Sequence, residues 1–192
     1  MLEVLRRIVQ EVDNAPSFQA ALDVLVASVR EATHTEVCSV YLLDDRTERL
    51  VLMANEGFNP SSIGVVSLGF GEGLVGLCAT REEPINLQDA ATHPSYVYFP
   101  ETGEERYNAF LGVPIMNRRK VLGVLVVQQF ENRRFDEGEV AFLVTLSAQL
   151  SGVVAHAKVM GQLEVVRGSR ATPTQIYQGI TGATGVTLGR AV

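Results

Sequence analysis

A glycine-rich segment, Gly71-Glu-Gly-Leu-Val-Gly76, has the G-x-G-x-x-G spacing with which many proteins hold the pyrophosphate of a dinucleotide. In those proteins the glycine loop joins a strand to a long crossover helix of a parallel sheet. Here the helical pattern of residues 74–81 is only about two turns long, and the segments before it have the pattern of an antiparallel hairpin. We therefore expect the glycines to let a tight loop pass close to a sheet, and a dinucleotide site is the alternative.

The two cysteines, Cys38 and Cys78, lie in apolar segments that lack the spacing of a metal site. The sequence favours reduced thiols in the core, although a thiol near a helix start can be reactive. The histidines lie in different segments, and no Ser, Cys or Asp stands at triad spacing from any of them. The sequence thus predicts no catalytic residue and no metal site in this chain. An enzyme that uses either cysteine is the alternative.

Residues 88–107 combine prolines, tyrosines and acidic residues without a helical or strand period. A loop of this length inside a compact domain is usually functional. Aromatic rings with polar tips suit a lid that packs on a small ligand and hydrogen-bonds it. The alternative is that the loop only packs onto a sheet. The aromatic residues concerned are Tyr96, Tyr98, Phe99 and Tyr107.

Helical patterns near both ends and strand patterns between them predict the elements that must position these residues. Apolar side chains recur every three or four residues in 2–12, in 18–32 after the N-cap candidate Ser17, and from Asp136 as far as Val166. Runs of β-branched and apolar residues predict strands at 36–44, 50–55, 64–68, 84–87, 108–116 and 120–129. Residues 121–127 are almost continuously apolar, which predicts a central strand. The fold class is α+β, an antiparallel sheet with terminal helices on one face and loops over the other.

The composition limits the kinds of partner that the chain can bind. Of its 192 residues 46% are hydrophobic, enough for one core in a domain of residues 1–167, and the turn-rich residues 168–176 are typical of a linker. A net charge of −6 disfavours nucleic acid and anionic membranes. We find no apolar run of the roughly 18 residues that span a membrane, and no signal peptide. We expect a cytoplasmic protein that binds small molecules or other proteins.

Several short segments, in their order and spacing, resemble a GAF domain over about residues 17–157. They are residues 38–44, 72–76, 85–90, 93–94, 111–115, 121–125 and 135–137. The resemblance implies a GAF fold, with a central antiparallel sheet, terminal helices on one face and a loop-covered ligand pocket on the other. Cyclic-nucleotide-binding members carry an Asn-Lys pair where this chain has Gln128 and Gln129. A cyclic nucleotide is therefore not the expected ligand.

Residues 82–87, 98–105, 122–129 and 133–137 are similar, more particularly, to the N-terminal domain of nitrogen-type enzyme I, a family of phosphoenolpyruvate-protein phosphotransferases. Residues 177–192 resemble the strand that opens the phosphohistidine domain of that family, and the rest of that domain is expected beyond this chain. The resemblance implies a regulatory domain without phosphotransfer activity or cofactor of its own. Magnesium is expected only in the absent catalytic part of a parent phosphotransferase.

The resemblance also implies an effector and partners. The effector would be glutamine or a related metabolite that reports nitrogen status. The partners would be the phosphotransfer domains of the same polypeptide and the phosphocarrier protein of the nitrogen branch. The apolar stripes of the first and last helices predict a homodimer as well. A dimerisation and coupling module that binds no ligand is the alternative function.

The expected ligand pocket lies between the sheet and the long loop. An amino acid effector needs an anionic partner for its ammonium group and a cationic one for its carboxylate. Glu56 or Glu101 is the candidate for the former and Arg106 for the latter. The predicted ligand-binding residues are Ser39, Tyr41, Glu56, Leu74, Val75, Tyr96, Tyr98, Glu101, Arg106, Tyr107, Asn108 and Gln128.

Overall fold

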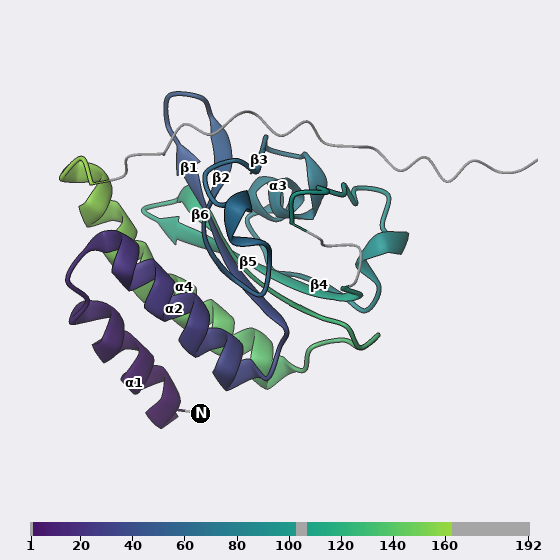
Figure 1. Ribbon diagram of the computed structural model, residues 1–192, viewed down its shortest axis with the longest axis horizontal. Helices are drawn as coiled ribbons and strands as arrows, with labels where there is room; N and C mark the ends of the chain where they lie inside the picture. Colours follow the sequence, from purple (N-terminus) through teal and green to yellow (C-terminus); the bar gives the residue numbers. More distant parts are fainter. Residues whose placement is uncertain (1, 103–106, 163–192) are drawn as a thin grey trace, which may run out of the picture.

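An antiparallel sheet of six strands forms the centre of the computed structural model, which describes residues 2–102 and 107–162 (Figure 1). Its strand order is β3-β2-β1-β6-β5-β4, and every pair is antiparallel. β6 lies between β1 and β5, which confirms the central position predicted for residues 121–127. The strands are β1 Val37–Asp44, β2 Arg49–Glu56, β3 Ser67–Leu68, β4 Ile85–Leu87, β5 Ala109–Asn117 and β6 Lys120–Gln129.

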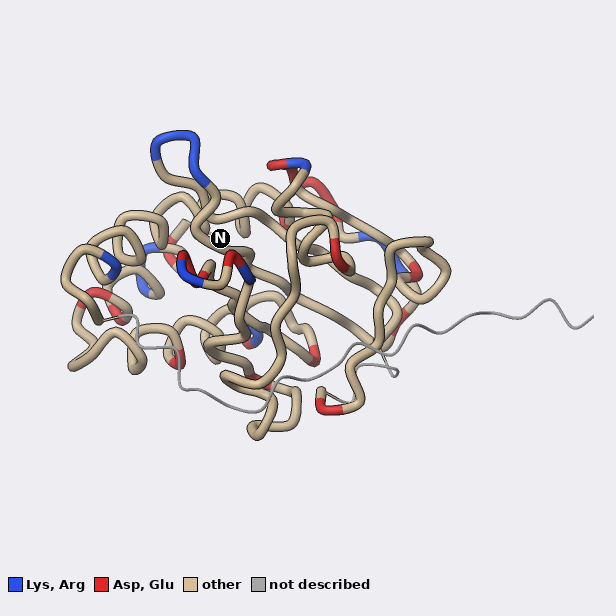
Figure 2. The backbone as a smooth tube through the Cα atoms, turned by 90° about the horizontal axis from the view of Figure 1, so that it is seen from above, with Lys and Arg blue, Asp and Glu red and all other residues tan. Residues whose placement is uncertain are grey.

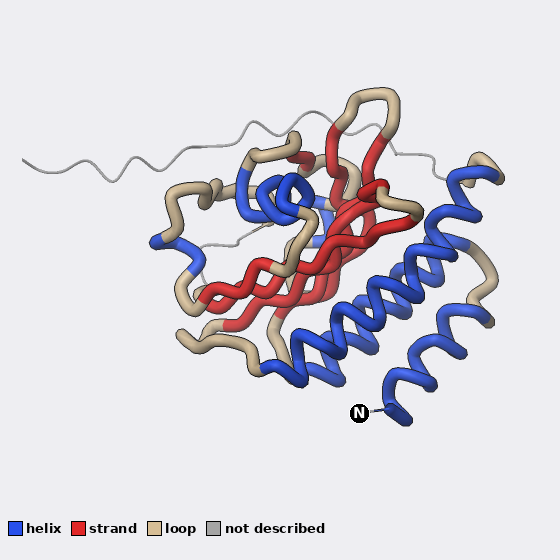
Figure 3. The backbone as a smooth tube through the Cα atoms, turned by 180° about the vertical axis from the view of Figure 1, so that it is seen from behind, coloured by secondary structure: helices blue, strands red, loops and turns tan. Residues whose placement is uncertain are grey.

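Three helices cover one face of the sheet (Figure 3). α2 (Phe18–Thr33) and α4 (Glu137–Val159) pack directly on the strands, and α1 (Leu2–Asp13) lies outside them. The other face carries α3 (Gly73–Arg81) together with the single turns η1 (Pro60–Ser62) and η2 (Ala90–Thr92). Charged residues of both signs are spread along the chain rather than gathered in one region (Figure 2). The arrangement confirms the α+β prediction of terminal helices on one face and loops on the other.

The side chains of β1 divide the interior into two cores because successive residues of a strand point to opposite faces. Cys38, Val40 and Leu42 point to the helices. Val37 and Tyr41 point to the side that α3 and the loops cover. Every residue from Val37 to Leu42 is buried, so both faces of this strand are shielded from water. The sheet therefore separates a helix-side core from a loop-side core.

Local hydrogen bonds explain where the long helices begin. The hydroxyl of Ser17 accepts a hydrogen bond from the backbone N–H of Ala20, so the predicted N-cap of α2 is confirmed. At the start of α4, Asp136 accepts from the N–H of Glu139, and Glu139 accepts from the N–H of Asp136. Hydrogen bonds from the Arg133 guanidinium to Glu139 lower the pKa of that carboxyl. Carboxylates in the first turn also suit the helix dipole.

Two of the predicted bounds are wrong. α4 ends at Val159 rather than reaching Val166, because the chain turns at Gly161, whose φ is +68°. The third strand is only Ser67–Leu68 rather than residues 64–68, because η1 and the positive φ of Gly64 bend the chain before it. The boundary near residue 168, the linker 168–176 and the strand 177–192 lie outside the described residues.

The glycine-rich segment is a packing device in an antiparallel sheet. A Cβ on Gly76 would lie 2.2 Å from the carbonyl oxygen of Gly69, and one on Gly73 would lie 2.7 Å from Leu68. The loop can pass over the start of α3 only because Gly73 and Gly76 have no Cβ atom. α3 has nine residues and no parallel strand follows it in the described sheet, so the crossover unit of a dinucleotide site is not formed.

α4 is long and apolar enough to cross a membrane by length and composition, a property that the search for an apolar run in the sequence missed. Eight of its residues are nevertheless buried against the rest of the domain, among them Phe142, Leu146 and Val154. Its apolar character is therefore accounted for in large part by its place over the sheet, where it packs on β5 and β6.

Candidate functional site

The loop side of the sheet is the candidate site, and several predicted residues lie there. Ser39 stands between Val37 and Tyr41 on β1, so its side chain shares their face. Gln128 of β6 faces the same side, since it pairs with Val37 and its strand neighbours Val124 and Val126 belong to the loop-side core. Ser39 and Gln128 are buried, with 0% and 1% of their surface exposed. The structure thus brings Ser39, Tyr41 and Gln128 to one face.

α3 and its glycine loop cover part of this face. Leu74 and Val75 are buried in the loop-side core, as expected for residues at the start of the helix. Glu72 holds the loop in place: its Oε2 accepts from the N–H of Gly69 at 2.7 Å and from Nη2 of Arg49 at 3.0 Å. Arg49 also donates to the backbone oxygen of Ser67 at 2.8 Å. This Arg49–Glu72 pair was not among the predicted residues, because only the fold brings β2 next to the loop.

The aromatic residues of the long loop pack onto the sheet to different extents. Phe99 and Tyr107 are buried in the loop-side core, and Tyr96 packs against it. The ring of Tyr107 stacks on Phe130 at 4.8 Å, and its hydroxyl donates to the carbonyl oxygen of Gly57. Tyr98 is half-buried. The loop therefore forms a lid over the sheet, and ligand contacts by its tyrosines stay a prediction.

Two buried polar atoms have no hydrogen-bond partner among the described residues, the hydroxyl Oγ of Ser39 and the carboxylate Oε2 of Glu101. Glu101 lies in the lid, two residues after the buried Phe99. The next residue of the lid, Thr102, accepts a hydrogen bond at its backbone oxygen from the N–H of Asn59. An unpartnered buried polar group costs about 1–3 kcal/mol, and a charged group costs more. Such groups call for a specific explanation in a native domain.

Two predicted residues use their polar side-chain groups elsewhere, and a third lies outside the described residues. Glu56 points to the helix side, where its carboxylate lies 3.4 Å from Arg30 of α2 at the exposed end of β2. The side-chain amide of Asn108 donates to the carbonyl oxygen of Phe130 at 2.7 Å, so one of its two N–H groups is already used. Arg106 lies outside the described residues.

The thiols have the properties of core residues. Cys38 is fully buried on the helix side, and Cys78 is fully buried in α3, where its Sγ donates to the carbonyl oxygen of Glu83. Burial raises the pKa of Cys38, and it raises the pKa of Cys78 to about 12. Because the thiolate is the reactive form, neither thiol is activated. No group of three metal-ligating side chains is found in residues 2–102 and 107–162.

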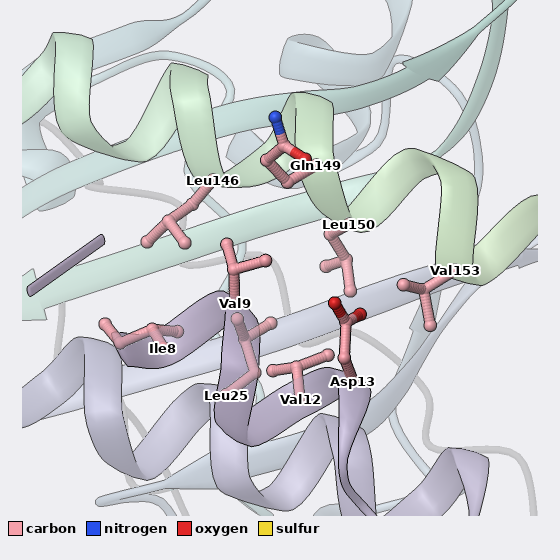
Figure 4. Close-up of a pocket in the computed structure, with 9 residues that line it drawn as sticks. All are labelled: Ile8, Val9, Val12, Asp13, Leu25, Leu146, Gln149, Leu150 and Val153. Atoms are coloured by element: carbon pink, nitrogen blue, oxygen red, sulfur yellow. The ribbon is translucent and has the colours of Figure 1, made fainter. Parts of the chain in front are cut away.

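A hollow lies on the other side of the sheet, between α1, α2 and α4 (Figure 4). Its volume is about 60 Å³, well below the roughly 300 Å³ at which ligand pockets begin. Apolar side chains such as Val9 and Leu150 line it, with Asp13 and Gln149 as its polar members. The hollow is best described as an imperfectly filled seam between helices.

Asn86 is a positioning residue that sequence reasoning missed. Its side-chain amide donates to the carbonyl oxygen of Phe135 at 2.8 Å, and its Oδ1 accepts from the N–H of the same residue at 3.2 Å. This two-way contact fixes the entry to α4 against β4, 49 residues away in the chain. The only sequence signal is the position of Asn86 among the segments that resemble the GAF family.

Comparisons with known proteins agree with this architecture. The GAF domain model matches residues 17–154. A protein of Salmonella typhimurium, named phosphoenolpyruvate-dependent phosphotransferase system, is 46% identical over 185 residues, which are 96% of this chain and 25% of that protein. Its namesake from Escherichia coli is 45% identical over the same shares. This chain therefore spans about a quarter of the length of the curated relatives it matches.

Solved structures extend the comparison. The GAF domain of an Acinetobacter phosphoenolpyruvate-protein phosphotransferase is 51% identical, with a TM-score of 0.77 over 84% of this chain and 97% of that one. The corresponding domain from Coxiella burnetii is 48% identical, with a TM-score of 0.81 over 84% and 96%. A free methionine-R-sulfoxide reductase of Neisseria meningitidis shares the fold, with a TM-score of 0.70 over 82% and 90%, but only 23% of the residues.

Proposed function

The chain belongs to the GAF domain family, and from this premise we propose that it is the small-molecule-sensing regulatory domain of a phosphoenolpyruvate-dependent protein phosphotransferase. The similarity to GAF domains of phosphoenolpyruvate-protein phosphotransferases supports the assignment to that enzyme class. The phosphotransfer domains of the same polypeptide and the phosphocarrier protein of the nitrogen branch are the partners under this proposal. The magnesium-dependent chemistry belongs to the catalytic part, beyond this chain.

The proposal that the domain senses a small molecule is based on two buried polar atoms on the loop side of the sheet. Ser39 Oγ and Glu101 Oε2 are shielded from water and have no partner among the described residues. Both atoms can accept hydrogen bonds, and one belongs to a carboxylate. A ligand that brings hydrogen-bond donors, one of them cationic, would satisfy them. An α-ammonium group has this chemistry.

Glutamine, or a related amino acid, fits this requirement. Its ammonium group matches the carboxylate of Glu101, and its side-chain amide is both donor and acceptor, which suits Ser39 and the amide of Gln128. A cyclic nucleotide would bring a phosphate anion towards Glu101, which like-charge repulsion disfavours. Under this proposal the effector is glutamine or a related metabolite, and the domain responds to nitrogen status.

The test is calorimetric titration of the 192-residue chain with glutamine, glutamate, 2-oxoglutarate and a cyclic nucleotide. We expect saturable binding of glutamine and a loss of at least about tenfold in affinity in Glu101→Gln, since a hydrogen bond to a charged group contributes about 1.5–3 kcal/mol. Glu56→Gln is the matched control, because Glu56 lies on the other side of the sheet. The proposal would be contradicted if none of the four compounds bound, or if both variants lost the same amount of affinity for glutamine.

A dimerisation and coupling module remains the second candidate, and the outer face of α4 favours it. That face carries small and apolar residues at exposed or half-buried positions: Ala141, Val144, Ala148, Gly152 and Ala155. Exposed apolar side chains on a long helix are typical of a surface that a partner covers. Light scattering that finds a monomer at all accessible concentrations would eliminate this candidate, and a ligand-binding dimer would combine both.

A further inference from the structure

The turn between β5 and β6 has an unusual composition for its backbone conformation. Arg118 and Arg119 are its two central residues, and their φ angles are +46° and +65°. Two consecutive residues with positive φ in a two-residue hairpin loop make a type I′ turn, for which Asn-Gly is the preferred sequence. Arginine is strained in this conformation because its Cβ approaches the following carbonyl group. The chain therefore keeps two arginines where other residues would be more stable.

These arginines are part of a concentrated positive charge in an acidic chain. Lys120 follows them, and all three side chains are exposed at the tip of a projecting hairpin, which is the long basic stretch of Figure 2. None of the three makes an ion pair with an acidic residue in the described part of the chain. The chain as a whole has a net charge of −6. Strain and like-charge repulsion thus coincide at one turn.

The basic turn lies at the end of the sheet where the described chain also ends. Leu42 pairs with Gly123, so the end of β1 and the beginning of β6 are neighbours. The last turn of α4 is fastened to the same place: Nζ of Lys158 donates to the backbone oxygen of Leu43 at 2.8 Å and to Asp45 at 2.9 Å. This end therefore combines the basic turn, the β1–β2 turn and the exit of the last helix.

The exit end also has exposed apolar surface and a hollow. Val159 and Met160 are 85% and 61% exposed at the end of α4. Beside them lies a hollow of about 170 Å³, lined by residues of the β1–β2 hairpin and by Lys158 and Gly161. Apolar surface rimmed by charge is typical of a protein interface. The matched part is about a quarter of the length of the relatives, so the remainder of such a polypeptide is available as a partner within the same molecule.

We propose that the exit end, made of the basic turn 118–120 and residues 158–161 beside the β1–β2 turn, is the docking surface for the phosphotransfer part of the same polypeptide, and that this part binds the basic turn through an acidic patch. This docking proposal rests on the proposed function in one respect: it takes the chain to belong to a polypeptide that also contains the phosphotransfer domains. Tethering supplies a high local concentration, so a weak electrostatic contact suffices. Nucleic acid is disfavoured as the occupant, because a net negative domain with one short basic run repels a polyanion.

The test compares amide hydrogen exchange in the 192-residue chain and in the full-length polypeptide, without any effector. We expect residues 42–46 and 158–162 to exchange at least about threefold more slowly in the full-length protein at low salt. This protection is lost at about 0.5 M salt, because exposed charges are then screened within a few ångströms. Equal exchange in the two proteins, or protection that salt leaves unchanged, would overturn the proposal.

The variant Arg118→Asn/Arg119→Gly separates stability from docking, because it should stabilise the turn but weaken the contact with the partner. Relief of the strained turn is expected to raise Tm by about 4 °C, while loss of the charge abolishes the protection. Arg6→Gln/Arg134→Gln removes the same charge from exposed residues elsewhere and should retain the protection. Equal loss in this control overturns the proposal. The proposal is also overturned if the protection of the 192-residue chain increases with protein concentration, because the surface would then bind a second copy of the chain. If glutamine does not bind, the proposed sensing function is wrong, but the docking proposal is unaffected.

Discussion

Ser39 is a polar residue at a fully buried position near the start of β1. Its neighbours on the same face, Val37 and Tyr41, are members of the loop-side core. Its hydroxyl loses its hydration on folding and gains no hydrogen bond from the described residues. A residue that lowers stability in this way is typical of a functional position. Ser39 is therefore the sharpest probe of whether the loop side receives a ligand.

Substitution Ser39→Ala should raise the free energy of unfolding of the ligand-free chain by about 1 kcal/mol, because it removes an unsatisfied buried hydroxyl. The same change should weaken effector binding. Urea unfolding measures the first effect and calorimetry the second. Ser147→Ala is the control, since Ser147 is equally buried but its hydroxyl donates to the carbonyl oxygen of Val144. A gain of stability in Ser147→Ala, or none in Ser39→Ala, would contradict this account.

At the scale of elements, several side-chain contacts converge on the entry to α4. Arg133 makes two hydrogen bonds of 2.8 Å to the carboxylate of Glu139, and its guanidinium lies 4.6 Å from the centre of the Phe135 ring. Asn86 holds the backbone of Phe135 from β4. The capping box of Asp136 and Glu139 then starts the helix. These contacts fix the start of α4 against the sheet.

Asp136→Ala should lower the free energy of unfolding by about 1 kcal/mol, because it leaves the backbone N–H of Glu139 without its cap. Glu137→Ala removes a carboxylate from the same turn but no capping bond, and we expect a loss of about 0.3 kcal/mol. Chemical denaturation at neutral pH distinguishes the two values. Equal losses would show that charge at the helix start, rather than the capping bond, is responsible.

At the scale of the whole molecule, α1 adds a third layer outside α2 and α4. The GAF domain model begins at residue 17, so this helix lies outside the matched part of the family. Its buried residues are Ile8 and Val12, which belong to the helix-side core. The hollow between the three helices shows that the layer is not tightly packed throughout (Figure 4). α1 thus completes the core through a few apolar anchors.

Ile8→Ala should cost about 2–4 kcal/mol of unfolding free energy, because a fully buried side chain is truncated and leaves a cavity. Leu2→Ala is the matched control in the same helix, since Leu2 is 79% exposed, and its cost should be close to zero. Urea unfolding of the two variants provides the measurement. A negligible cost for Ile8→Ala would mean that α1 does not pack on the domain in solution.

The sequence by itself determined the elements, their order and the family. The helices and the longer strands lie within about two residues of their predicted bounds, apart from the end of α4, because hydrophobic period and caps such as Ser17 are local properties of the chain. The short β3 and the end of α4 differ because positive φ at Gly64 and Gly161 redirects the chain. Such turns have a weaker sequence signal than a hydrophobic period.

Only the tertiary structure decided which side of the sheet each candidate residue faces. Strict alternation from Leu50 and Leu52 would place Glu56 on the loop side with Ser39. A bulge in the pairing of β1 with β2 instead matches Val40 with Ala54 but Tyr41 with Leu52, so that one extra residue enters β2. Every later side chain of β2 therefore changes face, and Glu56 meets Arg30 on the helix side. Of the two predicted carboxylates, this leaves Glu101 as the one with a buried oxygen that has no partner among the described residues.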